Sequence, residues 1–223
     1  MKVLAESMTL PFISDGILVE IMKVLAEAEV SYLSPFFRAG KRTWNIAGTA
    51  EVLLKCNFTH LIYENHEDIM PGGRARRLFQ RCCEVGNLEA VYFEGLRLAI
   101  HSVDINLGIE MLVRNDKGHG KSTLAAAFFA ICSGDREQAS VLFKSFSANH
   151  GGLVSEKARF LGNEIKWDIV MLNPPGLDTY METFSYPDDD VVYLPECADD
   201  HVFPHECHLC YMYSCALEVC GML

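Results

Sequence analysis

One phrase of apolar and polar positions recurs between residues 79 and 150 and gives the chain its clearest pattern. The stretch EVGNLEAVYFEGLRLAIHS at 84–102 is echoed by DKGHGKSTLAAAFFAICSG at 116–134, with an offset of 32 residues. In this register small residues match small ones and bulky residues match bulky ones. The paired positions are Gly86 with Gly118, Ala90 with Ser122, Tyr92 with Leu124 and Gly95 with Ala127. A fixed period of this length predicts stacked helix pairs, because one pair cannot cover its own apolar face.

The same pattern continues on both sides of the second phrase. GIEMLV at 108–113 is echoed by ASVLFK at 139–144, and His150-Gly151 then takes the place of His119-Gly120. Upstream, the run from Arg74 predicts a helix that ends at Gly86. We therefore expect an array of about two and a half helical repeats over residues 74–165.

Residues 10–57 predict a separate module of three short amphipathic helices. Leu10-Pro11 opens it, and Ser14 or Asp15 can cap the first helix. Helical spacing places one set of apolar residues on one face of that helix: Ile17, Leu18, Ile21, Val24 and Leu25. Further apolar patches follow at 31–37 and 50–55. Three such helices make a small core, so part of this apolar surface is expected to belong to a partner.

Polar residues and the breaker Pro71-Gly72-Gly73 predict a linker at 58–73. The last segment, 166–223, is acidic and interrupted by prolines, so we expect it to be rich in loops until the cysteines begin. The predicted fold class is all-α: a small helical module, a short repeat array and a Cys/His tail.

Composition narrows the function further. The chain has 223 residues, half of them hydrophobic, and a formal net charge of -11. Nucleic acid and anionic membranes are therefore not expected partners, because binding them needs clustered Lys and Arg. The longest apolar run, 124–132, is too short to span a bilayer, and residues 1–9 lack the core of a secretion signal, so an intracellular location is expected.

The tail carries a candidate metal site. Cys207-x-x-Cys210 has the spacing with which two thiolates on one turn share a zinc ion, and a second pair must complete the tetrahedron. Cys197 and Cys220 are the first choices, with His201, His205 or Cys215 as substitutes. The alternative is a set of reduced thiols beside an apolar patch, Tyr211 to Tyr213.

Two strings resemble parts of enzyme motifs. GHGKST at 118–123 ends like a phosphate-binding loop, but Asn115 stands where that motif needs glycine, and 105–113 has helical spacing where it needs a strand. The repeat register explains the string without a nucleotide, and Lys121 is then expected to be a solvated helix residue. KWDIVMLNPPG at 166–176 resembles the Asn-Pro-Pro loop of amino-group methyltransferases, but Gly176 replaces the aromatic, and a helix or strand end stopped by prolines is the simpler interpretation. No enzyme is predicted.

The N-terminal segments LPFISDGILVEIM, SYLSPFFRAGKRTW and AEVLLKCNF, followed by the repeats, resemble plant F-box proteins that carry tetratricopeptide-like (Sel-type) repeats. The resemblance implies a substrate receptor of an SCF-type ubiquitin ligase, in the nucleus or cytoplasm, with the S-phase-kinase-associated adaptor and a cullin complex as partners. A target protein of unknown identity would be held by the repeats or the tail. The family's later Cys-x-x-Cys implies a structural role for the tail cysteines.

The resemblance also implies an adaptor-binding face on the first helix. The residues implied are Leu10, Pro11, Ile17, Leu18, Ile21, Met22 and Leu25. The alternative is a plain repeat scaffold whose N-terminal helices only cap the array.

Overall fold

The computed structural model of the chain describes residues 13–115, 118–190, 192–197, 207 and 209–223. All regular structure within these ranges is helical, which confirms the predicted all-α class. Leu10, Pro11, His201 and His205 lie outside the described residues. The helices are α1 (Asp15–Ala28), η1 (Val30–Leu33), α2 (Ser34–Arg38), α3 (Lys41–Ala47), α4 (Ala50–Leu53), α5 (Thr59–Glu64), η2 (His66–Ile69), α6 (Arg76–Val85), α7 (Leu88–His101), α8 (Ile105–Val113), α9 (Gly120–Cys132), α10 (Arg136–His150), α11 (Glu156–Met171) and α12 (Tyr211–Met222).

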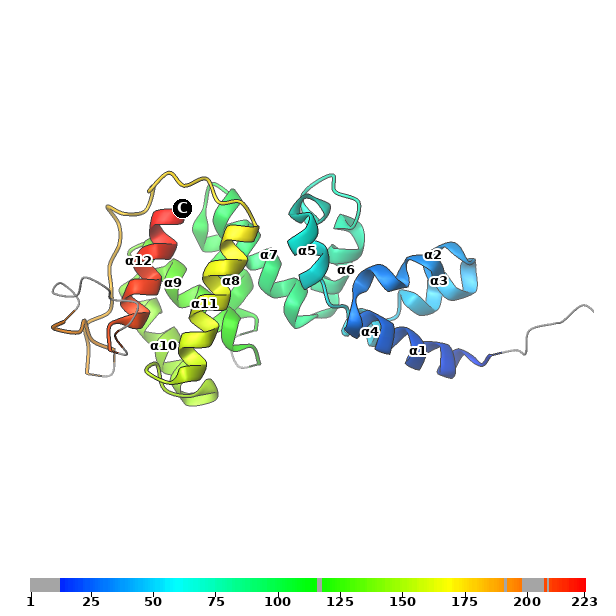
Figure 1. The fold of residues 1–223 in the computed structure, drawn as a ribbon, viewed down its shortest axis with the longest axis horizontal. Helices are drawn as coiled ribbons and strands as arrows, with labels where there is room; N and C mark the ends of the chain where they lie inside the picture. The colour runs from blue at the N-terminus through cyan, green and yellow to red at the C-terminus, as the bar shows by residue number, and fades with distance from the viewer. Residues whose placement is uncertain (1–12, 116–117, 191, 198–206, 208) are drawn as a thin grey trace, which may run out of the picture.

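The N-terminal module forms one end of an elongated molecule, and the repeat array forms the other (Figure 1). Ser14 caps α1, because its side chain accepts a hydrogen bond from the amide of Ile17. Leu18, Met22 and Ala26 recur every four residues and are buried where α1 packs on α3 and α4. The module has more helices than expected, since α3 is a helix of its own between the predicted second and third.

The predicted linker is a folded part of the molecule. It contains α5 and η2, and Phe58, Ile62 and Ile69 are fully buried within it. Apolar residues spaced by four, Phe58 and Ile62, give α5 a core-facing side that the neighbouring polar residues obscure in the sequence. Phe58 packs edge to face on Phe79 of α6, so the module and the array share one continuous core.

The first turn of α7 also holds the N-terminal module. Asn87 caps α7 and donates from its side-chain amide to the carbonyls of Leu53 and Cys56, at 2.9 Å each. The carboxylate of Glu89 accepts from the amide of Phe58 at 3.0 Å and from the Thr59 hydroxyl. The residues at the start of α7 therefore cap this helix and also bind the preceding module.

The helix starts of the array follow the period of the sequence. Asn87 and His119 are 32 residues apart, and each caps its helix by accepting an amide hydrogen bond three residues on, from Ala90 and Ser122. The third start differs, since α11 begins after Ser155 and His150 is the last residue of α10. Phe143 and Phe146 continue the buried side of α10, which makes this helix longer than its counterpart α8.

Helix α9 lies at the centre of the array (Figure 1). Every residue from Ser122 to Cys132 is buried, because α7, α8, α10, α11 and α12 all pack against this helix. A helix that is apolar on all sides needs such complete cover.

The C-terminal segment contributes to this core. Helix α11 runs through the boundary expected at residue 165 and ends before Asn173-Pro174-Pro175, as expected of a helix stopped by prolines. Residues 173–190 are not helical, but the Ser185 amide donates to the Ile131 carbonyl at 3.0 Å, and Tyr186 packs against Tyr213. Helix α12 is buried against α9 and α11, so the end of the tail is packed structure.

None of the helices in the described ranges combines the length and the hydrophobicity that crossing a bilayer requires.

Candidate functional site

The first candidate site is the outer side of α1. Ile17 and Val24 are 57% and 68% exposed, and Ile21 between them is also exposed, so the three form one apolar stripe. Leu18 and Met22 belong to the core, and Leu25 is half-buried against it. Of the described residues implied by the resemblance, therefore, only Ile17 and Ile21 are open to a partner. Val24 completes the stripe although the resemblance does not implicate it.

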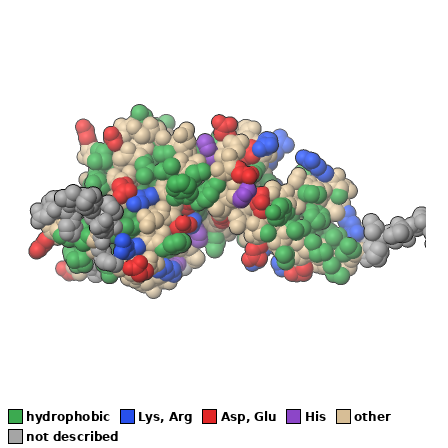
Figure 2. All heavy atoms as spheres, viewed as in Figure 1, with side chains coloured by type: hydrophobic (Ala, Val, Ile, Leu, Met, Phe, Trp, Pro, Cys, Tyr) green, Lys and Arg blue, Asp and Glu red, His purple; other side chains and the backbone are tan. Residues whose placement is uncertain are grey.

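Hydrophobic side chains gather on the surface of the N-terminal module in Figure 2. The exposed apolar residues of this module include Ile13 and Trp44 in addition to the α1 stripe. Arg42 of α3 bonds to the carboxylate of Asp15 at 2.6 Å and to the carbonyl of Ile13, which fixes the start of α1 against α3. The apolar surface is thus presented by two helices that this ion pair joins.

The second feature is a buried polar cluster around Asp168, which the sequence did not single out. Its carboxylate accepts from the Tyr63 hydroxyl at 2.5 Å, from the Tyr92 hydroxyl at 2.7 Å and from Lys121 Nζ at 3.0 Å. The four residues come from α11, α5, α7 and α9. Burial raises the pKa of both tyrosines, and the bonds to Asp168 raise it further, so the hydroxyls stay protonated as donors.

Lys121 was expected to be solvated, and this expectation is wrong. Its ammonium group is only partly exposed, pairs with the fully buried Asp168 and lies 4.9 Å from the ring centre of Tyr92. Helical spacing places Asp168 on the same side of the helix as the apolar residues Ile165 and Leu172. This spacing is the one signal in the sequence that Asp168 is buried. The partner of a buried carboxylate still cannot be found without the fold.

The rest of GHGKST is engaged in the helix start. Helix α8 precedes it in place of a strand, and Asn115 donates to the carbonyl of Leu88 at 2.7 Å. The Ser122 hydroxyl lies 2.8 Å from Nδ1 of His119. Burial lowers the pKa of His119 to about 4, so near neutral pH the ring is uncharged and can accept the capping amide bond. The string therefore supplies a cap and an ion pair to the repeat.

The third feature is a cluster of thiols at the start of α12. The sulfur atoms of Cys197, Cys207 and Cys210 lie within 4.8 Å of one another, and those of Cys197 and Cys207 are 3.9 Å apart. Amide hydrogen bonds from Cys210 and Leu209 lower the pKa of Cys207 to about 7. Three thiols with one of them readily ionised fit a zinc ion, which prefers thiolate ligands in a tetrahedral arrangement.

Cys220 does not lie with this cluster. It is ten residues beyond Cys210, about 15 Å along α12, and its thiol lies beside that of Cys132 in α9. Cys215 is also apart from the cluster, because it is buried against Tyr211 and Gly162. The structure thus joins three of the four sequence-based ligands, Cys197, Cys207 and Cys210, and separates Cys220 from them. The substitutes His201 and His205 fall outside the described residues.

The helical repeats are the part of the chain that resembles known proteins. A family model described as plant tetratrico peptide repeats matches residues 69–160, which is less than half of the chain. The matched stretch begins in η2 and ends in α11, so it covers the helical array α6 to α10. No curated protein and no solved structure matches the chain. This part of the chain is therefore similar to plant tetratricopeptide repeats, which are modules of protein interaction.

Proposed function

We propose that the chain is the substrate receptor of an SCF-type ubiquitin ligase. The observation that carries the proposal is the apolar stripe of Ile17, Ile21 and Val24, which α1 presents to solvent beside a small folded module. The F-box resemblance of this module names the S-phase-kinase-associated adaptor, itself bound to a cullin complex, as the partner for the stripe. A helix face of this kind docks on an apolar surface as anchors spaced by three or four residues. The chain itself would bind, and catalysis would belong to other subunits.

The similarity to tetratricopeptide repeats supports the second half of the proposal, the retention of a target protein. Contacts from Asn87 and Glu89 of α7 to residues 53–59 hold the docking module against the array. A fixed geometry between the two parts is useful in a receptor, because the target must be held at a set distance from the rest of the ligase.

The test is binding of the purified adaptor to full-length variants. Ile17→Asp combined with Val24→Asp should weaken adaptor binding by at least about 100-fold, because two anchors of the apolar contact become charged. Titration calorimetry measures the affinity, and thermal unfolding shows that the double variant remains folded. Val141→Asp on α10, where the valine is equally exposed, is the matched control and should bind normally.

Normal adaptor binding by the double variant would refute the docking face, and failure of the unaltered chain to bind would refute the ligase role. Leu18→Asp is unsuitable as a test, since Leu18 is buried and the change should unfold the module.

A plain scaffold is the second candidate, and the packing of α4 against α6, with Val52 and Leu53 of α4 buried, favours it. In a plain scaffold the N-terminal helices serve only to cover the array. That version predicts normal folding and no adaptor binding, so the same titration separates the two.

We also propose that Cys197, Cys207 and Cys210 hold a structural zinc ion together with a fourth ligand from the chain. Bound zinc would fasten the segment before α12 to the first turn of that helix. Metal analysis of the purified chain should give about one zinc ion per molecule. Cys207→Ser should remove it, whereas Cys83→Ser, in a half-buried thiol outside the cluster, should retain it. Equal zinc content in both variants would contradict the site.

A further inference from the structure

Two of the clustered thiols lie close enough to bond to each other. The sulfur atoms of Cys197 and Cys207 are 3.9 Å apart, and either thiol can donate a hydrogen bond to the other. A disulfide bond is about 2 Å long, so the side chains have only a short gap to close. Neither residue lies in a helix, so helical hydrogen bonds do not hold the backbone at either position. The two thiols are therefore placed for disulfide formation.

The same two thiols are accessible to small molecules. Cys197 and Cys207 are half-buried, and residues 192–197 lie at the end of the molecule opposite the N-terminal module (Figure 1). The third thiol of the cluster belongs to Cys210, the N-cap residue of α12, and is buried. An oxidant in solution can therefore reach Cys197 and Cys207, whereas Cys210 is closed to it.

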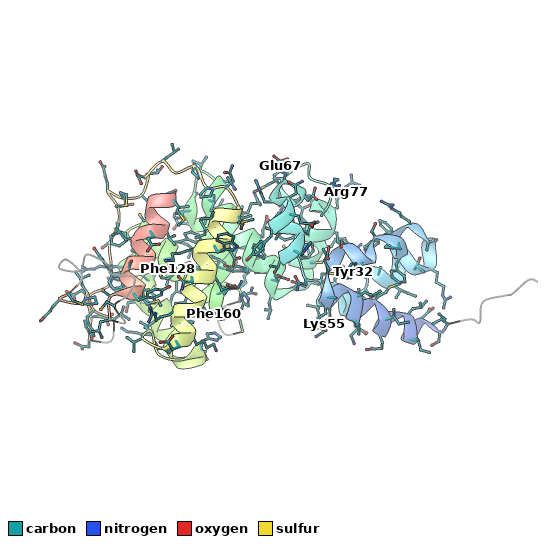
Figure 3. All side chains as sticks on the ribbon, viewed as in Figure 1. Tyr32, Lys55, Glu67, Arg77, Phe128 and Phe160 are labelled. Atoms are coloured by element: carbon teal, nitrogen blue, oxygen red, sulfur yellow. The ribbon has the colours of Figure 1, made fainter. Side chains whose placement is uncertain are left out.

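Two further pairs of neighbouring thiols lie in the core. The thiol of Cys56 lies beside that of Cys82. The thiol of Cys132 lies beside that of Cys220, one turn of α9 beyond Phe128 and among the closely packed side chains of the array (Figure 3). All four cysteines are buried. Proximity alone does not make such a pair reactive, because an oxidant must also reach the sulfur atoms.

The remaining two thiols are held in the protonated form. Cys83 is half-buried, but burial and the nearby carboxylate of Glu94 raise the pKa of its thiol to about 12. Burial raises the pKa of the Cys215 thiol to about 11. Near neutral pH both thiols keep their protons, and a protonated thiol is a poor nucleophile. Both are therefore expected to react slowly with an oxidant.

We propose that Cys197 and Cys207 form an oxidation site, at which a small disulfide such as oxidised glutathione converts the two thiols to one disulfide bond. One sulfur of the pair attacks the small disulfide as a thiolate, which forms a mixed disulfide and releases one molecule of the small thiol. The other sulfur then attacks the protein sulfur of the mixed disulfide and releases the second molecule. The protein thiols are oxidised, the small disulfide is reduced, and the two protons of the pair pass to the released thiols.

Oxidation of the pair also removes two of the three proposed zinc ligands, because zinc binds the thiolate and not the disulfide. Zinc is therefore expected to leave when the bond forms, and this part of the inference rests on the proposed zinc site. Disulfide formation itself does not require the metal. Zinc binding by the segment before α12 would thus depend on the redox state of the surroundings.

The test uses the full chain, reduced and loaded with zinc and then exposed to oxidised glutathione. Peptide mass spectrometry should find one disulfide, between Cys197 and Cys207, and a colorimetric chelator should record the release of about one zinc ion per molecule. This bond should form at least about tenfold faster than any bond between Cys132 and Cys220, which must wait for local opening of the core. Dithiothreitol should reverse the reaction.

Three variants examine the pair itself. Cys197→Ser should leave a stable mixed disulfide between Cys207 and glutathione, since the second sulfur of the pair is missing. Cys210→Ser should still form the disulfide although it weakens the zinc site, and Cys83→Ser should behave as the unaltered chain. Reduced thiols at both Cys197 and Cys207 after the incubation, a bond from Cys207 to Cys210, or equally rapid oxidation of the buried thiols would each overturn the inference.

The two measurements separate this inference from the zinc site. Zinc that is retained with no disulfide formed would refute the oxidation site alone. A disulfide between Cys197 and Cys207 in a chain that carries no zinc when reduced would refute the metal site and support the oxidation site.

Discussion

Asp168→Ala should lower the free energy of unfolding by about 3 to 5 kcal/mol, the usual cost of removing one partner of a buried ion pair. The change leaves Lys121 largely buried without its carboxylate, and it removes the acceptor of the Tyr63 and Tyr92 hydroxyls. Each unsatisfied buried donor adds to the loss. Urea denaturation followed by circular dichroism measures the difference.

Matched variants separate the charge from the loss of packing. Glu110→Ala removes an exposed carboxylate of α8 and should change stability by less than about 0.5 kcal/mol. Lys121→Met with Asp168→Leu should recover only the part of the loss that comes from the unpaired ammonium group, because the Tyr63 and Tyr92 hydroxyls still lack their acceptor. A loss below about 1 kcal/mol in Asp168→Ala would show that the cluster is not a structural junction.

The positions at which the helices of the first two repeats begin can be predicted from the sequence, because each helix start depends on nearby residues. Asn87 and His119 cap through an amide three residues on, and such a short-range bond requires only the local order of residues. The third start was placed five residues too early. It depends on how far α10 continues, and Phe146 extends that helix through contacts within the folded array.

The apolar residues of α1 show a different limit of the sequence. Periodicity identified the apolar residues of α1. These residues cover a wider arc of the helix than the part that packs on the core, so some of them are buried and others are exposed. Leu18 and Met22 face α3 and α4, while Ile17 and Val24 face solvent. Only the placement of neighbouring helices separates these rows, so the sequence could not say which apolar residues a partner would find.

Long-range partners were beyond the reach of the sequence. Lys121 and Asp168 are 47 residues apart, and no local pattern joins them. For the same reason the sequence places Cys220 in the candidate metal site, since spacing alone does not show that its thiol lies beside that of Cys132 in α9. Cys207 and Cys210, three residues apart, were identified because their proximity is local.

Gly108→Ala should lower the free energy of unfolding by about 2 to 3 kcal/mol, although alanine is the better helix former. Helices α7 and α8 approach closely at Gly95 and Gly108. A Cβ atom at Gly108 would lie 2.5 Å from the amide nitrogen and the Cβ of Ala99 and 2.7 Å from the Gly95 carbonyl oxygen. Because backbone atoms are among these contacts, a side-chain rotation cannot relieve the overlap and the two helices must separate. Chemical denaturation gives the change in stability.

Gly16→Ala is the control for the higher helix propensity of alanine, since a Cβ atom at this position meets nothing within 4 Å. It should leave the stability unchanged or raise it by up to about 1 kcal/mol.

The second repeat allows the opposite substitution to be tested, because Ala127 and Ala139 occupy the positions that correspond to Gly95 and Gly108 in the sequence register. Ala139→Gly should cost about 1 kcal/mol through backbone entropy, with no overlap to relieve. If Gly108→Ala proved as stable as the unaltered chain, the close approach of α7 and α8 would not limit the packing of the first repeat.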